Sequence, residues 1–112
     1  MRVLARREGL FGQIRVLERK HDNARLYCIN SSVQTMTLPS GVSLFGYVHA
    51  AKLLVRDAES ILIIGGGGGS LATMLARQGR DVTVVDVDPA AEELARVYFG
   101  LDERVVWRTA EP

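Results

Sequence analysis

At 112 residues the chain has room for one domain with a small subdomain attached. Hydrophobic residues make up 47% of it and charged residues 24%, a composition that excludes a disordered protein. The net charge of +1 at pH 7 gives no overall basis for nucleic-acid binding, and no apolar run reaches the roughly 18–20 residues needed to span a bilayer. We therefore expect a folded cytoplasmic protein with no nucleic-acid or membrane partner.

The first 40 residues carry the pattern of β-strands separated by turns. Residues 13–18 alternate polar and apolar side chains, and residues 25–29 and 33–37 form two further strand-like runs. Asp, Asn and Ser, which favour turns, lie in the gaps at residues 20–23 and 30–32. The basic residues concentrated at the N-terminus interleave with this pattern, so we interpret them as a strand surface rather than as a targeting peptide or an anion-binding arm.

A helix is predicted next, because apolar residues recur at intervals of three and four. The residues that would share its apolar face are Leu44, Tyr47, Val48, Ala51, Leu54 and Val55. The run Ile61–Ile64 is apolar at every position, as expected for a central parallel strand. Glycines fill residues 65–69, and a second helix is predicted after them, ending near Gly79.

The last third of the chain alternates strand and helix. A strand-like run ends in Asp86, and Asp88 followed by Pro89 predicts the start of a third helix. Residues 104–107 predict another strand. The order of elements therefore predicts an α/β fold.

We expect this fold to be divided near residue 41. Residues 1–41 would form an N-terminal β-meander. Residues 42–112 would form a linking helix and the first half of a Rossmann-like, methyltransferase-type parallel sheet.

The series strand, glycine loop, helix, strand and acid between Ile61 and Asp86 predicts a nucleotide site. The anionic part of a nucleotide must approach the backbone closely at a helix N-terminus, which requires residues without a Cβ atom, here Gly65, Gly67 and Gly69. The ribose needs an acceptor for its hydroxyls, and a carboxylate at the tip of the second strand supplies one. The alternative is a glycine-rich turn that only packs strand on helix.

The kind of nucleotide is open at this point. The loop can be interpreted as a relaxed dinucleotide fingerprint, with Asp86 at an adenosine ribose of NAD or FAD. Two observations argue against that interpretation. A dinucleotide fingerprint usually opens its domain, whereas about sixty residues precede this one. The spacing of Gly65, Gly67 and Gly69 also fits a methyltransferase-type loop.

Several segments resemble the spermidine synthase family. Residues 61–69 are similar to its Ile-Gly-Gly-Gly-Asp-Gly-Gly signature, and residues 84–88 to its Val-Glu-Ile-Asp segment. Upstream, residues 12–16 resemble its Tyr-Gln-x-Ile strand, and residues 32–35 the segment that ends in Ile-Gln-x-Thr. Residues 45–49 align with Phe-x-Tyr-His-Glu, so the resemblance covers nearly the whole chain.

The resemblance implies a small N-terminal β-domain followed by a Rossmann-like catalytic domain. In the family that domain binds decarboxylated S-adenosylmethionine and passes its aminopropyl group to putrescine. The glycines would lie along the tail of the nucleotide, the glutamines near it, and the aspartate at its ribose. The implied binding residues are Gln13, Gln34, Gly65, Gly66, Gly67, Gly69 and Asp86.

The chain also departs from the family pattern. Gly68 replaces the aspartate of the glycine loop, Ser43-Leu44 replaces an acidic pair, and His49 replaces a glutamate. Those acids help to hold cationic amines. The family's adenine-binding segment reads Thr109-Ala110-Glu111 here, and the fourth strand with its catalytic aspartate lies outside the 112 residues. We therefore assign no catalytic residue and expect no aminopropyl transfer by the isolated chain, because an ammonium must lose a proton before it can attack.

Three functions stay open. The first is a spermidine-synthase-like transferase, or a fragment of one, that binds S-adenosylmethionine or its decarboxylated form, with a polyamine as a candidate acceptor. The second is an S-adenosylmethionine-dependent methyltransferase relative. The third is a non-catalytic nucleotide-binding or assembly module.

Two further expectations concern assembly and metals. In a family-type sheet without its fourth strand, the apolar strand Ile61–Ile64 would have an open edge, so we expect a homodimer or higher oligomer that covers it. His21, His49 and Cys28 lack ligand spacing, so no metal site is predicted. Cys28 lies in an apolar run and predicts a buried, inert thiol.

Overall fold

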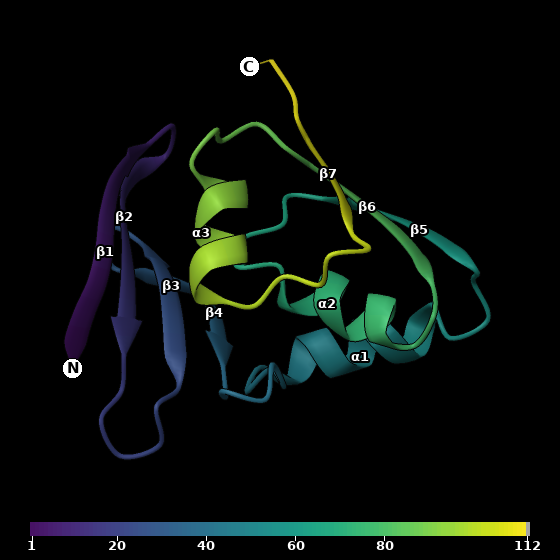
Figure 1. Ribbon diagram of the computed structural model, residues 1–112, viewed down its shortest axis with the longest axis horizontal. Coiled ribbons are helices and arrows are strands. Elements are labelled where there is room, and N and C mark those ends of the chain that lie inside the picture. The colour runs from purple at the N-terminus through teal and green to yellow at the C-terminus, as the bar shows by residue number, and fades with distance from the viewer. Residues whose placement is uncertain (112) are drawn as a thin grey trace.

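The computed structural model describes residues 1–111 (Figure 1). Its N-terminal part is an antiparallel sheet with the strand order β1-β2-β3-β4. The strands are β1 (Arg2–Gly9), β2 (Gly12–Glu18), β3 (Arg25–Ile29) and β4 (Ser32–Thr37). Short turns join them, and Asn23 and Asn30 have φ values of 58° and 52°. Asn tolerates this left-handed conformation better than most residues, so the predicted turns are confirmed.

The N-terminal sheet turns one apolar face toward the rest of the molecule. Ile14, Val16 and Tyr27 on this face are at most 2% exposed and pack in one cluster with Leu94 of helix α3 (Ala91–Tyr98). Side chains alternate between the two faces of a strand. The residues of β2 and β3 next in sequence to Ile14, Val16 and Tyr27 therefore point to the other face of the sheet.

Helix α1 (Gly46–Leu54) follows the meander, as predicted, but its predicted apolar face is mostly not buried. Leu54 is 84% exposed and Tyr47 is 65% exposed, and Val48 is the buried residue of the helix. The reason is that α1 packs mainly against α2 (Ser70–Arg77), which leaves much of its apolar side exposed.

The C-terminal part is a parallel sheet with the order β5-β6-β7. Its strands are β5 (Ser60–Ile64), β6 (Asp81–Asp86) and β7 (Val106–Thr109). Helix α2 connects β5 to β6, and α3 connects β6 to β7 (Figure 1). An antiparallel meander followed by a parallel Rossmann-like sheet confirms the predicted α/β fold class.

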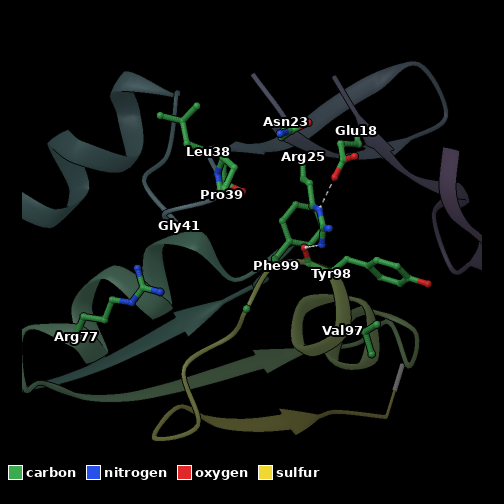
Figure 2. Close-up of a pocket in the computed structure, with 12 residues that line it drawn as sticks. Glu18, Asn23, Arg25, Leu38, Pro39, Gly41, Arg77, Val97, Tyr98 and Phe99 are labelled. Atoms are coloured by element: carbon green, nitrogen blue, oxygen red, sulfur yellow. Dashed lines mark hydrogen bonds and ion pairs between the residues drawn. The ribbon is translucent and has the colours of Figure 1, made fainter. Parts of the chain in front are cut away.

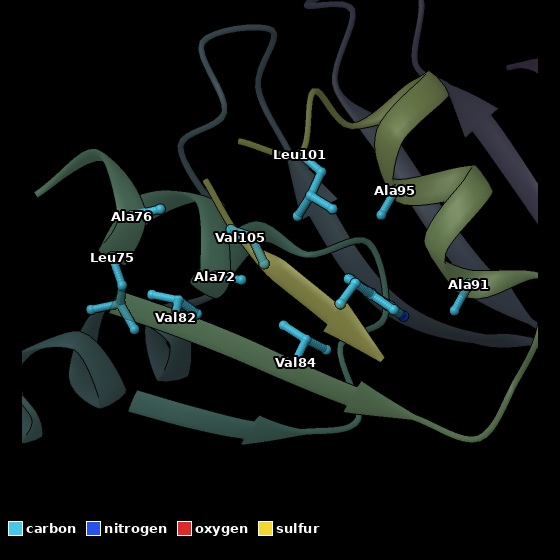
Figure 3. Packing of buried hydrophobic residues seen from close by; sticks show 10 residues of the cluster. Ala72, Leu75, Ala76, Val82, Val84, Ala91, Ala95, Leu101 and Val105 are labelled. Carbon is cyan, nitrogen blue, oxygen red and sulfur yellow. The ribbon is translucent and has the colours of Figure 1, made fainter. Parts of the chain in front are cut away.

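One face of the parallel sheet is covered by α2 and α3 (Figure 3). Small side chains on both helices let them approach the strands closely. The buried residues of this cluster are Ala72, Leu75, Ala76, Val82, Val84, Ala91, Ala95, Leu101, Val105 and Trp107. On the opposite face Leu62 is 61% exposed, Ile64 74% and Val106 46%.

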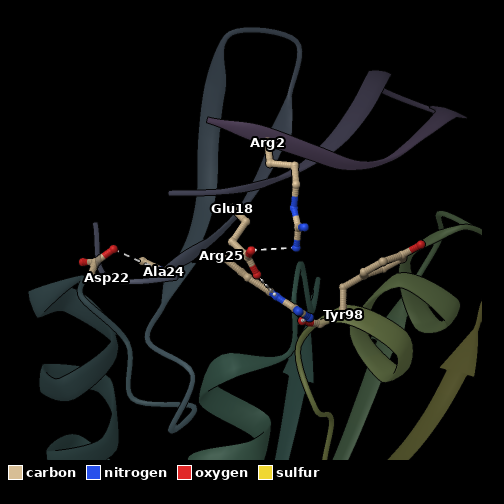
Figure 4. Close-up of polar contacts among 6 residues, drawn as sticks. All are labelled: Arg2, Glu18, Asp22, Ala24, Arg25 and Tyr98. Carbon is tan, nitrogen blue, oxygen red and sulfur yellow. Dashed lines mark hydrogen bonds and ion pairs between the residues drawn. The ribbon is translucent and has the colours of Figure 1, made fainter. Parts of the chain in front are cut away.

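An ion-pair chain joins the two parts on one side (Figure 4). The Glu18 carboxylate accepts hydrogen bonds from Arg2 at 2.8 Å and from Arg25 at 3.2 Å. Arg25 Nη1 in turn donates to the carbonyl oxygen of Tyr98, the last residue of α3, at 2.6 Å. A guanidinium at a helix C-terminus also offsets the negative end of the helix dipole.

Asp88 joins the two parts a second time. It is 4% exposed, and its Oδ2 accepts the backbone N–H of Leu10, in the β1–β2 turn, at 3.1 Å. Its Oδ1 accepts the N–H of Ala90 at 3.0 Å. Residues 89–90 therefore form a turn closed by Asp88, and α3 begins at Ala91 rather than at the predicted Pro89.

Candidate functional site

The glycine loop is anchored on the tip of strand β6. The Gly65 N–H donates to the Val85 carbonyl at 2.8 Å, and the Gly66 N–H donates to Asp86 Oδ2 at 2.9 Å. A Cβ atom on Gly66 would lie 2.5 Å from the Trp107 ring, and Gly67 has a φ of +52°. The first position has no room for a side chain and the second disfavours one, so the loop requires glycine for two different physical reasons.

The N-terminal sheet contacts the same loop. The Gly68 N–H donates to Thr35 Oγ1 of β4 at 3.1 Å. A Cβ atom on Gly68 would lie 3.0 Å from Thr35 and 3.2 Å from Phe99. This crowding gives a physical basis for glycine at the position where the family signature has aspartate.

Gly67 is left with an available backbone donor. Within residues 65–69, its N–H is the one that makes no hydrogen bond to a described residue. It lies just before the N-terminus of α2, where backbone donors and the helix dipole favour negative charge. A ligand carboxylate at this position would find an unused partner.

Asp86 both supports the loop and faces the solvent. Its Oδ2 accepts the Gly66 N–H and its Oδ1 accepts the Asp88 N–H, each at 2.9 Å. The residue is half-buried. Each carboxylate oxygen can accept a second hydrogen bond, so capacity for two ribose hydroxyls remains.

A cavity of about 520 Å³ lies between the two sheets in front of this loop. Its lining is mostly apolar, with one acidic wall. The lining residues are Phe11, Tyr27, Ile29, Ser32, Gln34, Ile64, Gly65, Gly67, Val85, Asp86, Val87, Asp88 and Ala91. This cavity therefore brings together four of the residues that the sequence predicts for the nucleotide: Gln34, Gly65, Gly67 and Asp86.

The other three predicted residues lie elsewhere. Gly66 lines a smaller adjoining cavity of about 160 Å³, which also includes Gln34 and Gly67. Gly69 is the residue before α2, with a φ of +78°, and is buried against Leu101. Gln13 is exposed on β2 and is not among the residues that line either cavity. Its contact with the nucleotide stays a prediction.

Tyr27 and Phe11 line the large cavity and were not predicted from the sequence. Tyr27 is 2% exposed, and burial together with the nearby Asp88 and Asp86 raises the pKa of its hydroxyl. Phe11, in the β1–β2 turn, is 64% exposed. Both belong to the N-terminal sheet, and no local motif marks either of them.

The smaller cavity has no acidic residue among the described residues that line it. Two of the positions at which the family has acids serve the structure instead. The buried Ser43 Oγ accepts the Phe45 N–H at 3.0 Å, and His49 Nε2 donates to the Ser43 carbonyl at 2.7 Å. A cationic amine in this cavity would lack a counter-charge.

A third cavity of about 530 Å³ opens at the C-terminal end of α3 and is lined by charged, polar and apolar residues (Figure 2). Arg25 and Glu18 pair with each other at its edge, as described above. Arg77, from α2, points into it and donates to the Ser40 carbonyl at 2.6 Å. The charged groups of this cavity are largely occupied by protein partners.

Other predicted features lie away from these cavities. Cys28 is buried and free, and burial raises the pKa of its thiol, which confirms the predicted buried cysteine. Among residues 1–111, no group of three or more His, Cys, Asp or Glu side chains is arranged to hold a metal ion. Over the same residues, every helix is too short or too polar to cross a membrane.

No protein-family model matches the chain. A polyamine aminopropyltransferase of Oceanobacillus iheyensis is 33% identical over 95 residues, which cover 83% of this chain and 18% of that protein. The mitochondrial ubiquinone biosynthesis O-methyltransferase of Schizosaccharomyces pombe is 46% identical over 46 residues, which cover 41% of this chain and 17% of that protein. The chain therefore spans less than a fifth of the length of either curated relative.

A solved structure extends the comparison to the fold. A probable spermidine synthase from Corynebacterium glutamicum matches 96% of this chain and 44% of its own, with a TM-score of 0.77 and 20% sequence identity. The two sheets and their connecting helices thus share one arrangement with that protein. By sequence over most of its length, and with the fold in agreement, this chain is similar to proteins of the spermidine synthase family.

Proposed function

We propose that the chain forms the nucleotide-binding part of a cytoplasmic transferase that takes S-adenosylmethionine or decarboxylated S-adenosylmethionine. One observation carries the proposal: Gln34, Gly65, Gly67 and Asp86 come from separate segments and line one cavity of about 520 Å³. The resemblance to the spermidine synthase family supports the same class of ligand, because that family uses the decarboxylated form as its substrate.

The groups of the cavity suit the parts of such a ligand. Asp86 would accept hydrogen bonds from the ribose hydroxyls. The unused Gly67 N–H, next to the N-terminus of α2, would donate to the carboxylate of S-adenosylmethionine, a group that the decarboxylated form lacks. The apolar side chains of Val87 and Phe11, which lie on the same cavity, would cover the base.

Calorimetric titration tests the proposal. S-Adenosylmethionine, its decarboxylated form, methylthioadenosine and NAD should be compared on the same protein. Asp86→Ala should weaken binding of the adenosine ligands by about 1.5–3 kcal/mol, as the loss of a charged acceptor does. Asp81→Ala is the matched control, because Asp81 is an exposed carboxylate at the other end of β6.

The Asp86 variant needs a stability measurement beside the titration. Its carboxylate also accepts two backbone N–H groups, so the substitution removes support from the loop. A folded Asp86→Ala protein with unchanged affinity for every nucleoside would contradict the proposal.

A methyltransferase relative is the second candidate, and the small cavity favours it. The described residues that line this cavity include no acid, whereas a polyamine acceptor needs counter-charges. The segment of 46 residues that is similar to an O-methyltransferase also supports the methyltransferase candidate. Preference for S-adenosylmethionine over its decarboxylated form in the titration would favour this candidate. The isolated chain should turn over neither substrate, because we assign no catalytic base to it.

We also propose that the chain self-associates as a homodimer or higher oligomer. Strand β5 pairs with β6 on one side, and within residues 1–111 its other edge has no partner. The adjoining sheet face exposes Leu62, Ile64 and Val106. An open edge and a bare apolar face on the same strand favour burial against a second copy.

A further inference from the structure

The N-terminal sheet contributes a buried tyrosine to the large cavity. Tyr27, on the inner face of β3, is a polar residue that is 2% exposed and lines the cavity. Its ring is fixed by the cluster that contains Ile14 and Leu94, and it lies 6.0 Å from the Phe99 ring, tilted by 55°. A hydroxyl on a rigid, buried ring has a well-defined position and loses little entropy when it binds.

The hydroxyl of Tyr27 is not used by the protein. It makes no side-chain hydrogen bond within residues 1–111, whereas buried hydroxyls usually find a partner. It is also not sealed from solvent, because among the described side chains the one fully enclosed and unpaired polar atom is Trp107 Nε1. The hydroxyl therefore opens into the cavity that Tyr27 lines.

The residues around the Tyr27 hydroxyl determine which ligand group it can bind. Asp86 and Asp88 line the same cavity, and both contribute to raising the pKa of Tyr27, after burial itself. The hydroxyl thus stays protonated at neutral pH and acts as a donor beside a carboxylate acceptor. A sugar hydroxyl suits such a pair, since it can accept from one side and donate to the other.

We infer that Tyr27 is a ligand-contacting residue whose hydroxyl donates to a ribose hydroxyl that itself donates to Asp86. This inference rests on the proposed nucleoside site and deepens it, because it names a specificity residue in the N-terminal sheet. The pair would select a ribonucleoside over a deoxynucleoside through one shared hydroxyl.

The test is a titration of Tyr27→Phe with methylthioadenosine and its 2′-deoxy and 3′-deoxy analogues. The substitution removes only the hydroxyl and keeps the buried ring, and thermal unfolding would verify the fold. Tyr98→Phe is the matched control, because Tyr98 is a half-buried tyrosine that lines the third cavity instead.

Tyr27→Phe should weaken methylthioadenosine binding about 3- to 10-fold, the usual effect of one neutral hydrogen bond. The same substitution should leave the affinity for one of the two deoxy analogues unchanged, since that analogue lacks the partner hydroxyl. Tyr98→Phe should bind all three ligands as the unaltered chain does.

Three outcomes would overturn the inference, and they differ in what else they overturn. If Tyr27→Phe binds methylthioadenosine normally while Asp86→Ala does not, or if both deoxy analogues respond to Tyr27→Phe as methylthioadenosine does, the tyrosine contact is wrong and the nucleoside site stands. If the unaltered chain binds no nucleoside, both the inference and the proposed function fail.

Discussion

The N-terminal and C-terminal sheets bury their apolar surface in different ways. In the N-terminal sheet each strand pairs with the next strand along the chain, and the inner face is closed by α3 and the glycine loop. In the C-terminal sheet α2 and α3 close one face, while Leu62 and Ile64 on the other face stay exposed.

The difference follows from strand direction. An antiparallel meander needs only short turns, and one solvated face is normal for it. A parallel sheet is ordinarily covered on both faces, and the described residues cover one. Among the described residues, the C-terminal sheet therefore keeps an uncovered apolar face, and the N-terminal sheet is the part that completes the cavity.

The largest expected effect concerns the bare face of the parallel sheet. Leu62 and Val106 lie on either side of Thr83 in the strand register, so a Leu62→Lys, Val106→Lys double variant places two ammonium groups on this face. Light scattering should show a dimer or larger species for the unaltered chain at tens of micromolar and a monomer for the variant, because buried unpaired charge is costly. Val3→Lys, on an exposed residue of β1, should keep the original mass.

A monomeric unaltered chain at that concentration would remove the basis for this comparison. It would mean that the exposed apolar residues of β5 and β7 are tolerated in water, as scattered surface apolar residues often are.

A medium effect is expected at the junction between the sheets. Asp88→Asn leaves a single carbonyl oxygen for two backbone N–H groups, those of Leu10 and Ala90. We expect a loss of about 1–3 kcal/mol in the free energy of unfolding, measured by urea denaturation, because one buried donor loses its acceptor.

The matched control is the exposed link between the same two parts. Arg7 and Glu93 pair at 3.3 Å with side chains 39% and 59% exposed. Glu93→Gln should cost less than about 1 kcal/mol, as exposed pairs do. Equal losses for Asp88→Asn and Glu93→Gln would show that the buried carboxylate does not hold the sheets together.

How far the sequence could predict this architecture depends on whether the signal is local. The glycine loop and Asp86 were predictable because strand, loop, helix and acid follow one another within about 25 residues. Tyr27 was not, because its place in the cavity depends on pairing and packing between segments far apart in the chain. Helix α1, at residues 46–54, shows the same limit. Its periodicity predicted an apolar face, but it could not predict whether another segment covers that face.

The second role of Asp86 was equally hidden. Its position at a strand tip suggested a carboxylate free for ligand, and spacing alone gives no sign that Gly66 and Asp88 donate to it. Gly68 was visible as a departure from the family signature. Its cause, the contact with Thr35 of β4, appears only once the two sheets are placed together.

The smallest expected effect concerns the acid dependence of stability, and it is compared between one turn of each part. The Arg104 side chain, followed by its backbone N–H, lowers the pKa of Asp102 to about 2 in the turn before β7. Arg19 lowers the pKa of Asp22 still further in the β2–β3 turn. Each folded-state pKa lies below the unfolded value of about 3.9, so the stabilisation is complete above that pH and is lost as the pH falls through the folded value.

Thermal unfolding between pH 5 and pH 2 measures this difference. Asp102→Asn should remove part of the stability loss that the unaltered chain shows between about pH 4 and pH 2. Asp22→Asn should remove at least as much of that loss, because the unfolded chain takes up a proton at this position in the same window while the folded Asp22 takes up its proton only at lower pH. Identical curves for the three proteins would mean that neither ion pair contributes measurably.

Trp107, the single tryptophan of the chain, lies against the back of the glycine loop. Its indole is 8% exposed, its Nε1 is enclosed without a partner, and its ring edge leaves no room for a side chain on Gly66. Indole emission responds to the polarity and packing around the ring. The chain thus carries a built-in optical reporter directly behind the proposed binding loop, and occupancy of the cavity can be followed by fluorescence without adding any label.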